Sequence, residues 1–428
     1  MNAPLTAPPR PLAAYAAVTA AYWAFMLTDG ALRMLVLLHF NSLGFSPITL
    51  AWLFLLYEVA GIVTNLCAGW IAARFGLTTT LYAGLSLQIV ALIALSQLDP
   101  SWTVAVSVAF VMVAQGVSGV AKDLAKMGAK SAVKLLAPAE GGGLFRWVAA
   151  LTGSKNAVKG LGFLLGAALL GAAGFDGAAL GMAAVLAAIL GAVALFMPAG
   201  LPRGRPKDEI GRLRSGDPRI DRLSAARLFL FGARDVWFVV GVPIYFYGVL
   251  SDGTAEGRRE AFFLVGTFMA LWIIGYGAVQ AAAPALLRAR ERPVAEIARL
   301  AASLAFVLAL IPAGLAAAAW AATQGWTAPL GEPAPWLTAT LVGGLLMFGV
   351  VFALNSALHS YLILAFTRSD RVTMDVGFYY GANAAGRLLG TLLSGLSFQW
   401  GGLPLCLATA AAMALASWVC ARGLRDAS

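Results

Sequence analysis

Two lysines interrupt a stretch of the chain that is otherwise built from apolar, small and uncharged residues. Lys155 and Lys159 lie between Trp147 and Gly171 and are four residues apart, which places them on one face of a helix. A lysine at mid-membrane depth is costly, and such residues nearly always face a polar cavity and mark a pathway. This pattern favours a helix face that binds an anion, with Asn156 beside the lysines.

Two further pairs of charges fall inside apolar stretches. Asp29 and Arg33 are four residues apart, so they can pair along one helix face. Arg234 and Asp235 are adjacent, and because adjacent side chains point about 100° apart on a helix, we do not expect them to be simple partners. Each pair is either structural, locking helices together, or leaves an arginine free to bind phosphate-like oxygens through its planar fork of donors.

The remaining intramembrane charges are Arg387, one turn after Asn383, and Glu58. The cations outnumber the acids, which favours an anionic cargo over a cation or a drug. Glu58 is the best candidate for a carboxylate that exchanges a coupling proton, and Asp29 and Asp235 are the others. The alternative is that Glu58 is a permanent partner of one lysine or arginine.

The composition indicates which elements carry these residues. Of the 428 residues, 60% are hydrophobic and only 12% are charged, whereas a soluble globular protein has about 25% charged residues. We therefore predict an all-α, polytopic membrane protein. Apolar stretches of about 20 residues predict twelve transmembrane helices, roughly at 13–39, 47–73, 77–98, 102–122, 146–172, 177–198, 224–250, 261–286, 295–321, 336–366, 374–399 and 402–421.

The distribution of Lys and Arg predicts the orientation. If both termini are cytoplasmic, most of the 30 basic residues, including those from Arg203 to Arg227, lie on the cytoplasmic side. The opposite side keeps only Arg258 and Arg259. This asymmetry follows the positive-inside rule and accounts for most of the net charge of +10, so no nucleic-acid partner is needed to explain it.

The longest hydrophilic interruption divides the chain into two halves. The stretch from Gly69 to Gly76 between the second and third spans resembles the loop signature of major facilitator transporters, although Ala73 stands where that signature has Asp. Two six-helix halves around a central loop are the layout of these transporters. The predicted parts are a cytoplasmic tail at 1–12, a bundle at 13–198, a cytoplasmic loop at 199–223, a second bundle at 224–421 and a tail at 422–428.

A stripe of lysines precedes the fifth span, at Lys122, Lys126 and Lys130. It is interpreted either as a helix against anionic lipid headgroups or as a basic vestibule that draws anions inward.

Other reactive residue types give no sign of catalysis. The three cysteines are isolated, and His39 and His359 are expected to be satisfied structural residues. We therefore predict no metal site, no cofactor and no enzymatic activity.

Several separate motifs in both halves carry a more specific resemblance. They are Ser42–Pro47, Leu53–Leu66, Ser118–Met127, Ala129–Pro138, Leu151–Gly160 and Ala226–Phe238. Together these stretches resemble the ArsJ-type organoarsenical efflux permeases of the major facilitator superfamily. These permeases are encoded in bacterial arsenic-resistance operons.

The resemblance implies a multi-pass protein of the bacterial inner membrane that exports 1-arseno-3-phosphoglycerate and so confers arsenate resistance. Its implied functional partner is a glyceraldehyde-3-phosphate dehydrogenase that makes this compound. We expect a monomer working by alternating access, with proton coupling. Two alternatives stay open, namely an organophosphate/phosphate exchanger of the same fold and a non-transporting membrane sensor.

Overall fold

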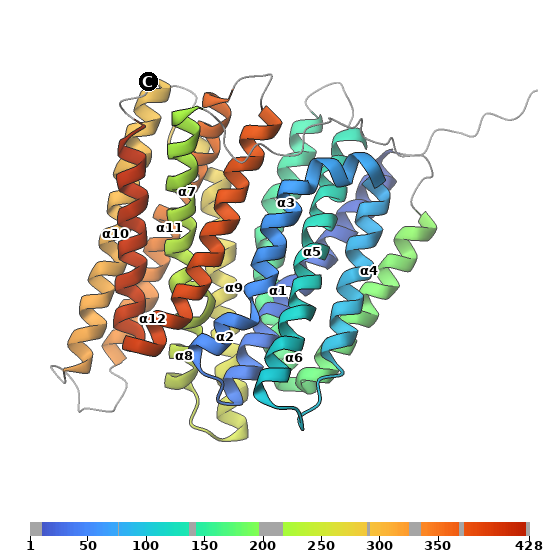
Figure 1. The fold of residues 1–428 in the computed structure, drawn as a ribbon, viewed down its shortest axis with the longest axis vertical. Coiled ribbons are helices and arrows are strands. Elements are labelled where there is room, and N and C mark those ends of the chain that lie inside the picture. The colour runs from blue at the N-terminus through green and yellow to red at the C-terminus, as the bar shows by residue number, and fades with distance from the viewer. Residues whose placement is uncertain are drawn as a thin grey trace, which may run out of the picture.

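The computed structural model describes residues 11–75, 77–136, 143–196, 217–288, 292–324, 335–367 and 372–424. Within these ranges the secondary structure is helical, with short connections and no strand (Figure 1). The predicted all-α class is therefore confirmed. The helices of the first half are α1 (Pro11–Ser42), α2 (Pro47–Leu53), α3 (Leu55–Phe75), α4 (Leu77–Leu95), α5 (Val104–Leu136) and α6 (Gly143–Phe196).

The second half continues the same architecture. Its helices are α7 (Pro218–Val236), the π-helical turn η1 (Trp237–Gly241), α8 (Val242–Leu250), α9 (Ala255–Leu286), α10 (Val294–Thr323), α11 (Pro335–Phe366) and α12 (Val372–Arg422).

Two of the long helices contain a break in the backbone. Gly174 in α6 has φ 70°, and Gly402 in α12 has φ 60°. Both lie in the left-handed region that glycine enters readily and other residues rarely do. Among the described residues, nine helices are long and apolar enough to cross a membrane, and α4 includes a shorter apolar helix at Thr79–Leu95. The predicted twelve spans require that α6 and α12 each count as two helices, joined at these glycines.

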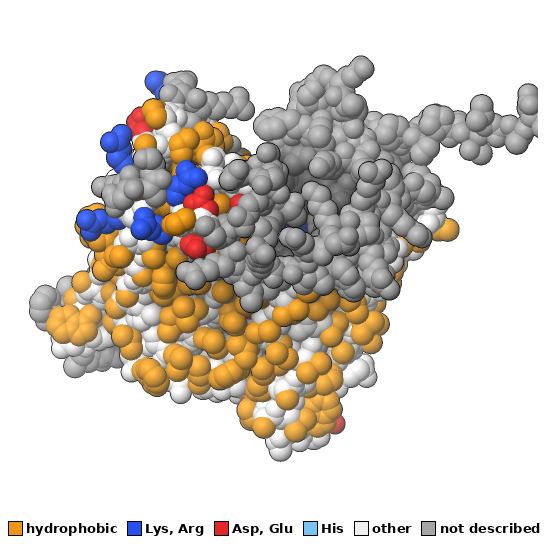
Figure 2. Space-filling view, turned by 45° about the horizontal axis from the view of Figure 1, so that its top comes forward, with side chains coloured by type: hydrophobic (Ala, Val, Ile, Leu, Met, Phe, Trp, Pro, Cys, Tyr) orange, Lys and Arg blue, Asp and Glu red, His pale blue; other side chains and the backbone are white. Residues whose placement is uncertain are grey.

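The surface has two clearly different zones. Lys and Arg side chains gather at the end of the molecule where α7 and α10 begin and α12 ends, and the flank below is mostly hydrophobic (Figure 2). We call this end the basic end. Large apolar side chains such as Leu195 and Trp400 are 81% and 76% exposed. Such a flank belongs in lipid, and the protein is a multi-pass membrane protein.

The start of α7 differs slightly from the predicted span. Asp217 caps this helix by accepting a hydrogen bond from the backbone N–H of Arg219, and Pro218 occupies the first turn. Because both residues favour a helix start, the helix begins six residues before position 224 and takes in the end of the predicted central loop.

The two halves pack their central helices in the same way. A Cβ on Gly166 of α6 would touch the backbone oxygen of Ala31 in α1, and a Cβ on Gly386 of α12 would touch that of Leu228 in α7. Only glycine permits such close backbone contact at these positions. The α1–α6 and α7–α12 pairs are therefore equivalent cores of the two bundles, and they carry most of the buried charges.

The bundles meet away from the basic end. A Cβ on Gly395 of α12 would lie 2.6 Å from Ala51 Cβ of α2, and one on Gly266 of α9 would lie 2.6 Å from Ala167 Cβ of α6. The side chain of Gln399 also accepts a hydrogen bond from the backbone N–H of Ile48, at 3.2 Å. These contacts close the bundle interface from the middle of the molecule to the end opposite the basic one.

Candidate functional site

A network of buried charges lies where the two bundles meet. Glu58 of α3 is 1% exposed, and its Oε1 atom accepts from Arg33 Nη2 and from Arg387 Nη2, each at 2.6 Å. Arg33 belongs to the first bundle and Arg387 to the second. One carboxylate oxygen thus joins an arginine of each bundle, and the expectation that Glu58 could be a partner of an arginine agrees with this geometry.

The network continues into the second bundle through Asp235. Its Oδ2 atom is 3.4 Å from Arg387 Nε, and its Oδ1 atom is 2.5 Å from Arg234 Nη2. The expectation that Arg234 and Asp235 are not partners was therefore wrong. The arginine side chain is long enough to fold back on its neighbour, which the angle between adjacent Cα–Cβ bonds does not show.

In the first bundle, Asp29 has different partners from those expected. Its Oδ2 atom is 3.2 Å from Lys159 Nζ of α6, and its Oδ1 atom accepts from Tyr57 Oη at 2.6 Å. Arg33 pairs instead with Glu58, so Asp29 and Arg33 do not form the pair that their spacing allowed, and each is bound to a neighbouring helix. Both side chains therefore find their partners on neighbouring helices rather than on the next turn of α1.

The lysine stripe of α5 enters this network at its first member. Lys122 is 9% exposed, and its Nζ lies 4.0 Å from the centroid of the Tyr57 ring. Lys126 Nζ is 3.3 Å from Asp123 Oδ1. The side chain of Lys130 and that of Ala73 in the loop signature lie outside the described residues. A vestibule formed by the stripe stays a prediction.

The other predicted site residues lie around the same interface. Lys155 is partly buried one turn before Lys159. Asn156 Nδ2 donates to Gln280 Oε1 of α9 across the bundle interface, at 3.4 Å. Asn383 of α12 is partly buried, and its Oδ1 atom has no hydrogen-bond partner among the described residues. The structure therefore brings the predicted cations and amides of both halves to one interface.

Sequence reasoning missed a second polar group in the second bundle. Arg227 was expected on the cytoplasmic side, but it is 4% exposed, and its Nη1 donates at 3.0 Å to both Ser356 O and Ser356 Oγ. His359 was expected to be satisfied, yet neither ring nitrogen has a partner among the described residues. The signal that could have revealed Arg227 is its spacing of seven residues from Arg234, which puts both on one face of α7.

A cavity opens between the bundles near the basic end. Its volume is about 350 Å³, and it is bounded by Ile62 of α3, the first turns of α7 and the start of α12. The lining residues include Ser224, Leu228, Phe378 and Ala382. This cavity lies on the basic-end side of the contacts between the bundles that are described above.

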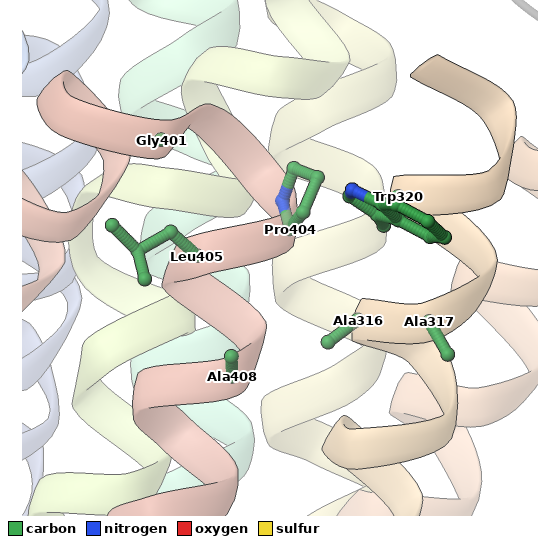
Figure 3. Close-up of a pocket in the computed structure, with 7 residues that line it drawn as sticks. All are labelled: Ala316, Ala317, Trp320, Gly401, Pro404, Leu405 and Ala408. Carbon is green, nitrogen blue, oxygen red and sulfur yellow. The ribbon is translucent and has the colours of Figure 1, made fainter. Parts of the chain in front are cut away.

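A second hollow has a different character. It is an apolar crevice between α10 and α12, where Trp320 of α10 lies opposite Pro404 of α12 (Figure 3). None of its lining residues is charged, and none belongs to the buried network. Its place on the hydrophobic flank is that of a contact with lipid rather than of a site for a polar cargo. Among the described residues, no group of His, Cys, Asp and Glu side chains could hold a metal ion.

Comparisons with known proteins identify the fold. No family model matches the sequence, and no curated protein matches it. A solved structure from work on substrate recognition in proton-dependent oligopeptide transporters aligns with a TM-score of 0.68, at 15% identity, over 97% of this chain and 98% of its own. A POT family transporter in complex with 5-aminolevulinic acid aligns with a TM-score of 0.67, at 16% identity, over 96% and 95%.

These matches cover nearly the whole chain, so the chain has the fold of these transporters. The descriptions of both matched structures name transporters. At such low identity the likeness concerns the fold alone.

Proposed function

We propose that this protein exports a small organic anion by alternating access, and that the anion is 1-arseno-3-phosphoglycerate. The observation that carries the proposal is the shared oxygen of Glu58. Two arginines from opposite bundles converge on one acceptor, and guanidinium groups are well suited to bind phosphoryl or arsenyl oxygens in place of a carboxylate. The arsenical identity of the cargo is supported by the motifs of the sequence alone.

The binding residues in this proposal are Lys155, Lys159, Arg33, Arg234 and Arg387, with the amides of Asn156 and Asn383. Glu58 carries the coupling proton, because protonation would release Arg33 and Arg387 for the anion. Asp29 and Asp235 are the alternatives, since each also holds a cation of the network. The basic end is cytoplasmic in this proposal, by the positive-inside rule.

The test uses an arsenic-sensitive bacterial strain that makes both the dehydrogenase and this protein. We expect Lys155→Ala and Lys159→Ala each to abolish arsenate resistance at unchanged protein level, because each removes a cation from the anion face. Arg258→Ala is the matched control, since Arg258 is an exposed cation that donates to the backbone oxygen of Gly253. Normal resistance in both variants would show that Lys155 and Lys159 do not belong to the binding site.

Everted membrane vesicles distinguish the cargo. Uptake of arsenic that requires the dehydrogenase, arsenate and glyceraldehyde 3-phosphate together supports the exporter. Exchange of phosphate against an organophosphate in the absence of arsenate would instead indicate an organophosphate/phosphate exchanger of the same fold. A sensor predicts no uptake under either condition.

A further inference from the structure

Arg227 is a buried cation that lacks a counter-charge in the described part of the chain. Its guanidinium donates only to the backbone and hydroxyl oxygens of Ser356, and its Nε atom has no partner there. No carboxylate of the described residues lies within 4.0 Å of it, in contrast to Arg33, Arg234 and Arg387. A charge removed from water without an opposite charge is strongly unfavourable, so this position is suited to an anion.

The neighbouring helix supplies two more groups without partners. Asn355 and His359 of α11 are both 0% exposed, and they lie four residues apart on one face of the helix. Neither the amide of Asn355 nor the ring of His359 has a hydrogen-bond partner among the described residues. They flank Ser356, which holds Arg227. Buried polar groups are normally satisfied, so this cluster holds donors and acceptors that a ligand could use.

One aromatic ring, that of Phe231, lies between Arg227 of this cluster and Arg234 of the charged network. Arg227 and Arg234 are seven residues apart, which is two turns or about 10 Å along one face of α7. Phe231 lies between them, with its ring centroid 4.1 Å from Arg227 Cζ and 4.9 Å from Arg234 Cζ. Two cations and an apolar spacer thus form a row that leads from the interface toward the basic end.

The same row borders the cavity between the bundles. Ser224, one turn before Arg227 on α7, lines that cavity together with Leu228. The hydroxyl of Ser224 is buried and has no partner in the described part of the chain. The cavity, whose lining also includes Asp221, therefore begins one turn from Arg227 on the same helix.

We propose that Arg227, Asn355 and His359 form a second anion subsite, which holds the far end of a substrate with a charged group at each end. The network around Arg387 and Arg234 binds one end, and Phe231 contacts the carbon chain between them. This inference rests on the proposed anion transport and deepens it, because it selects small organic anions with two charged ends over those with one.

The test compares a two-ended and a one-ended probe on the purified full-length protein. The probes are 3-phosphoglycerate, which carries a phosphoryl and a carboxylate group, and inorganic phosphate. We expect the wild type to bind 3-phosphoglycerate about tenfold more tightly than phosphate, and Arg227→Gln to lose this advantage while its affinity for phosphate is unchanged. Arg219→Gln is the control on the same helix, because the Arg219 side chain is 37% exposed and pairs with Asp217.

A second variant keeps the test decisive if Arg227→Gln does not fold. Asn355→Leu removes a buried amide that makes no hydrogen bond, so we expect thermal stability to hold while binding of 3-phosphoglycerate, but not of phosphate, weakens. The subsite is overturned if the wild type shows no advantage for the two-ended probe, as when water alone satisfies the cluster. It is also overturned if Arg227→Gln and Asn355→Leu keep the advantage, or weaken both probes equally.

Failure of the proposed function gives a different pattern. If neither probe binds the wild type and Lys159→Ala changes nothing, anion transport itself is contradicted and the subsite falls with it. If phosphate binds in a Lys159-dependent manner without an advantage for 3-phosphoglycerate, only the subsite is contradicted.

Discussion

The two bundles pack alike but balance their charges differently. In the first, Arg33, Lys126 and Lys159 each lie within 4.0 Å of a carboxylate of the same bundle. In the second, Arg234 and Arg387 share the single carboxylate of Asp235. Arg387 completes its coordination only by reaching Glu58 of the first bundle.

This difference leaves Arg387 dependent on a carboxylate of the other bundle, at the interface between the two. A structural ion-pair network would be expected to close within each bundle, because each must remain intact while the two move against each other. Here one pair spans the interface, so an anion that enters between the bundles competes with Glu58 for Arg387. The asymmetry therefore indicates where the cargo would act.

The largest effect is expected from Glu58→Gln. It removes the charge that the buried Arg33 and the partly buried Arg387 share, and breaking a buried pair in this way costs about 3–5 kcal/mol. We expect the free energy of unfolding in detergent to fall by this amount. Glu296→Gln is the control, since Glu296 pairs with Arg292 at 2.6 Å on the surface, with side chains 39% and 37% exposed, and should cost about 0–1 kcal/mol. Equal losses of unfolding free energy in the two variants would show that the Glu58 interactions with Arg33 and Arg387 stabilise the protein no more than a surface ion pair.

Glycine substitutions test whether the two bundles pack their central helices alike. Gly166→Ala and Gly386→Ala each force a Cβ against a backbone oxygen of the facing helix, which should cost about 1–3 kcal/mol of unfolding free energy. Gly181→Ala is the control, because a Cβ there meets nothing within 4 Å. Losses that differ strongly between Gly166→Ala and Gly386→Ala would show that the bundle cores are not equivalent.

The smallest effect is expected at Lys126. Its side chain is 32% exposed, and its partner Asp123 also accepts a hydrogen bond from Thr64 Oγ1 at 2.8 Å. Lys126→Met should therefore change the unfolding free energy by no more than about 1 kcal/mol. A loss as large as that of Glu58→Gln would mean that this pair belongs to the essential network and that the first bundle depends on every one of its pairs.

The sequence predicts the elements well because membrane spans follow from composition alone. Apolar length located the helices, and the spacing of Lys155 and Lys159 marked α6 as a helix that carries charge into the membrane. The pairing of those charges could not be predicted in the same way. Glu58 and Arg387 are 329 residues apart, and helical spacing reveals only neighbours on the same helix.

Arg227 illustrates a second limit of sequence reasoning. A basic residue at the edge of an apolar span is interpreted as part of a loop by the positive-inside rule, and Asp217 with Pro218 extended the helix past that edge. Burial of Arg227 then depends on how α7 packs against α11, which no local pattern records. The predicted residues therefore describe the part of the charged row at the bundle interface and leave out Arg227, which lies nearer the basic end.

The single oxygen of Glu58 has a consequence for the timing of the transport cycle. In the proposed function, an empty protein must pull Arg387 away from this atom, which is 2.6 Å from its Nη2, before the bundles can rock. A loaded protein can give Arg387 the oxygen of its cargo instead, so the barrier is lower when cargo is present. For a transporter of this kind, idle cycles would be rare, and the gradient that drives export would not be spent without export.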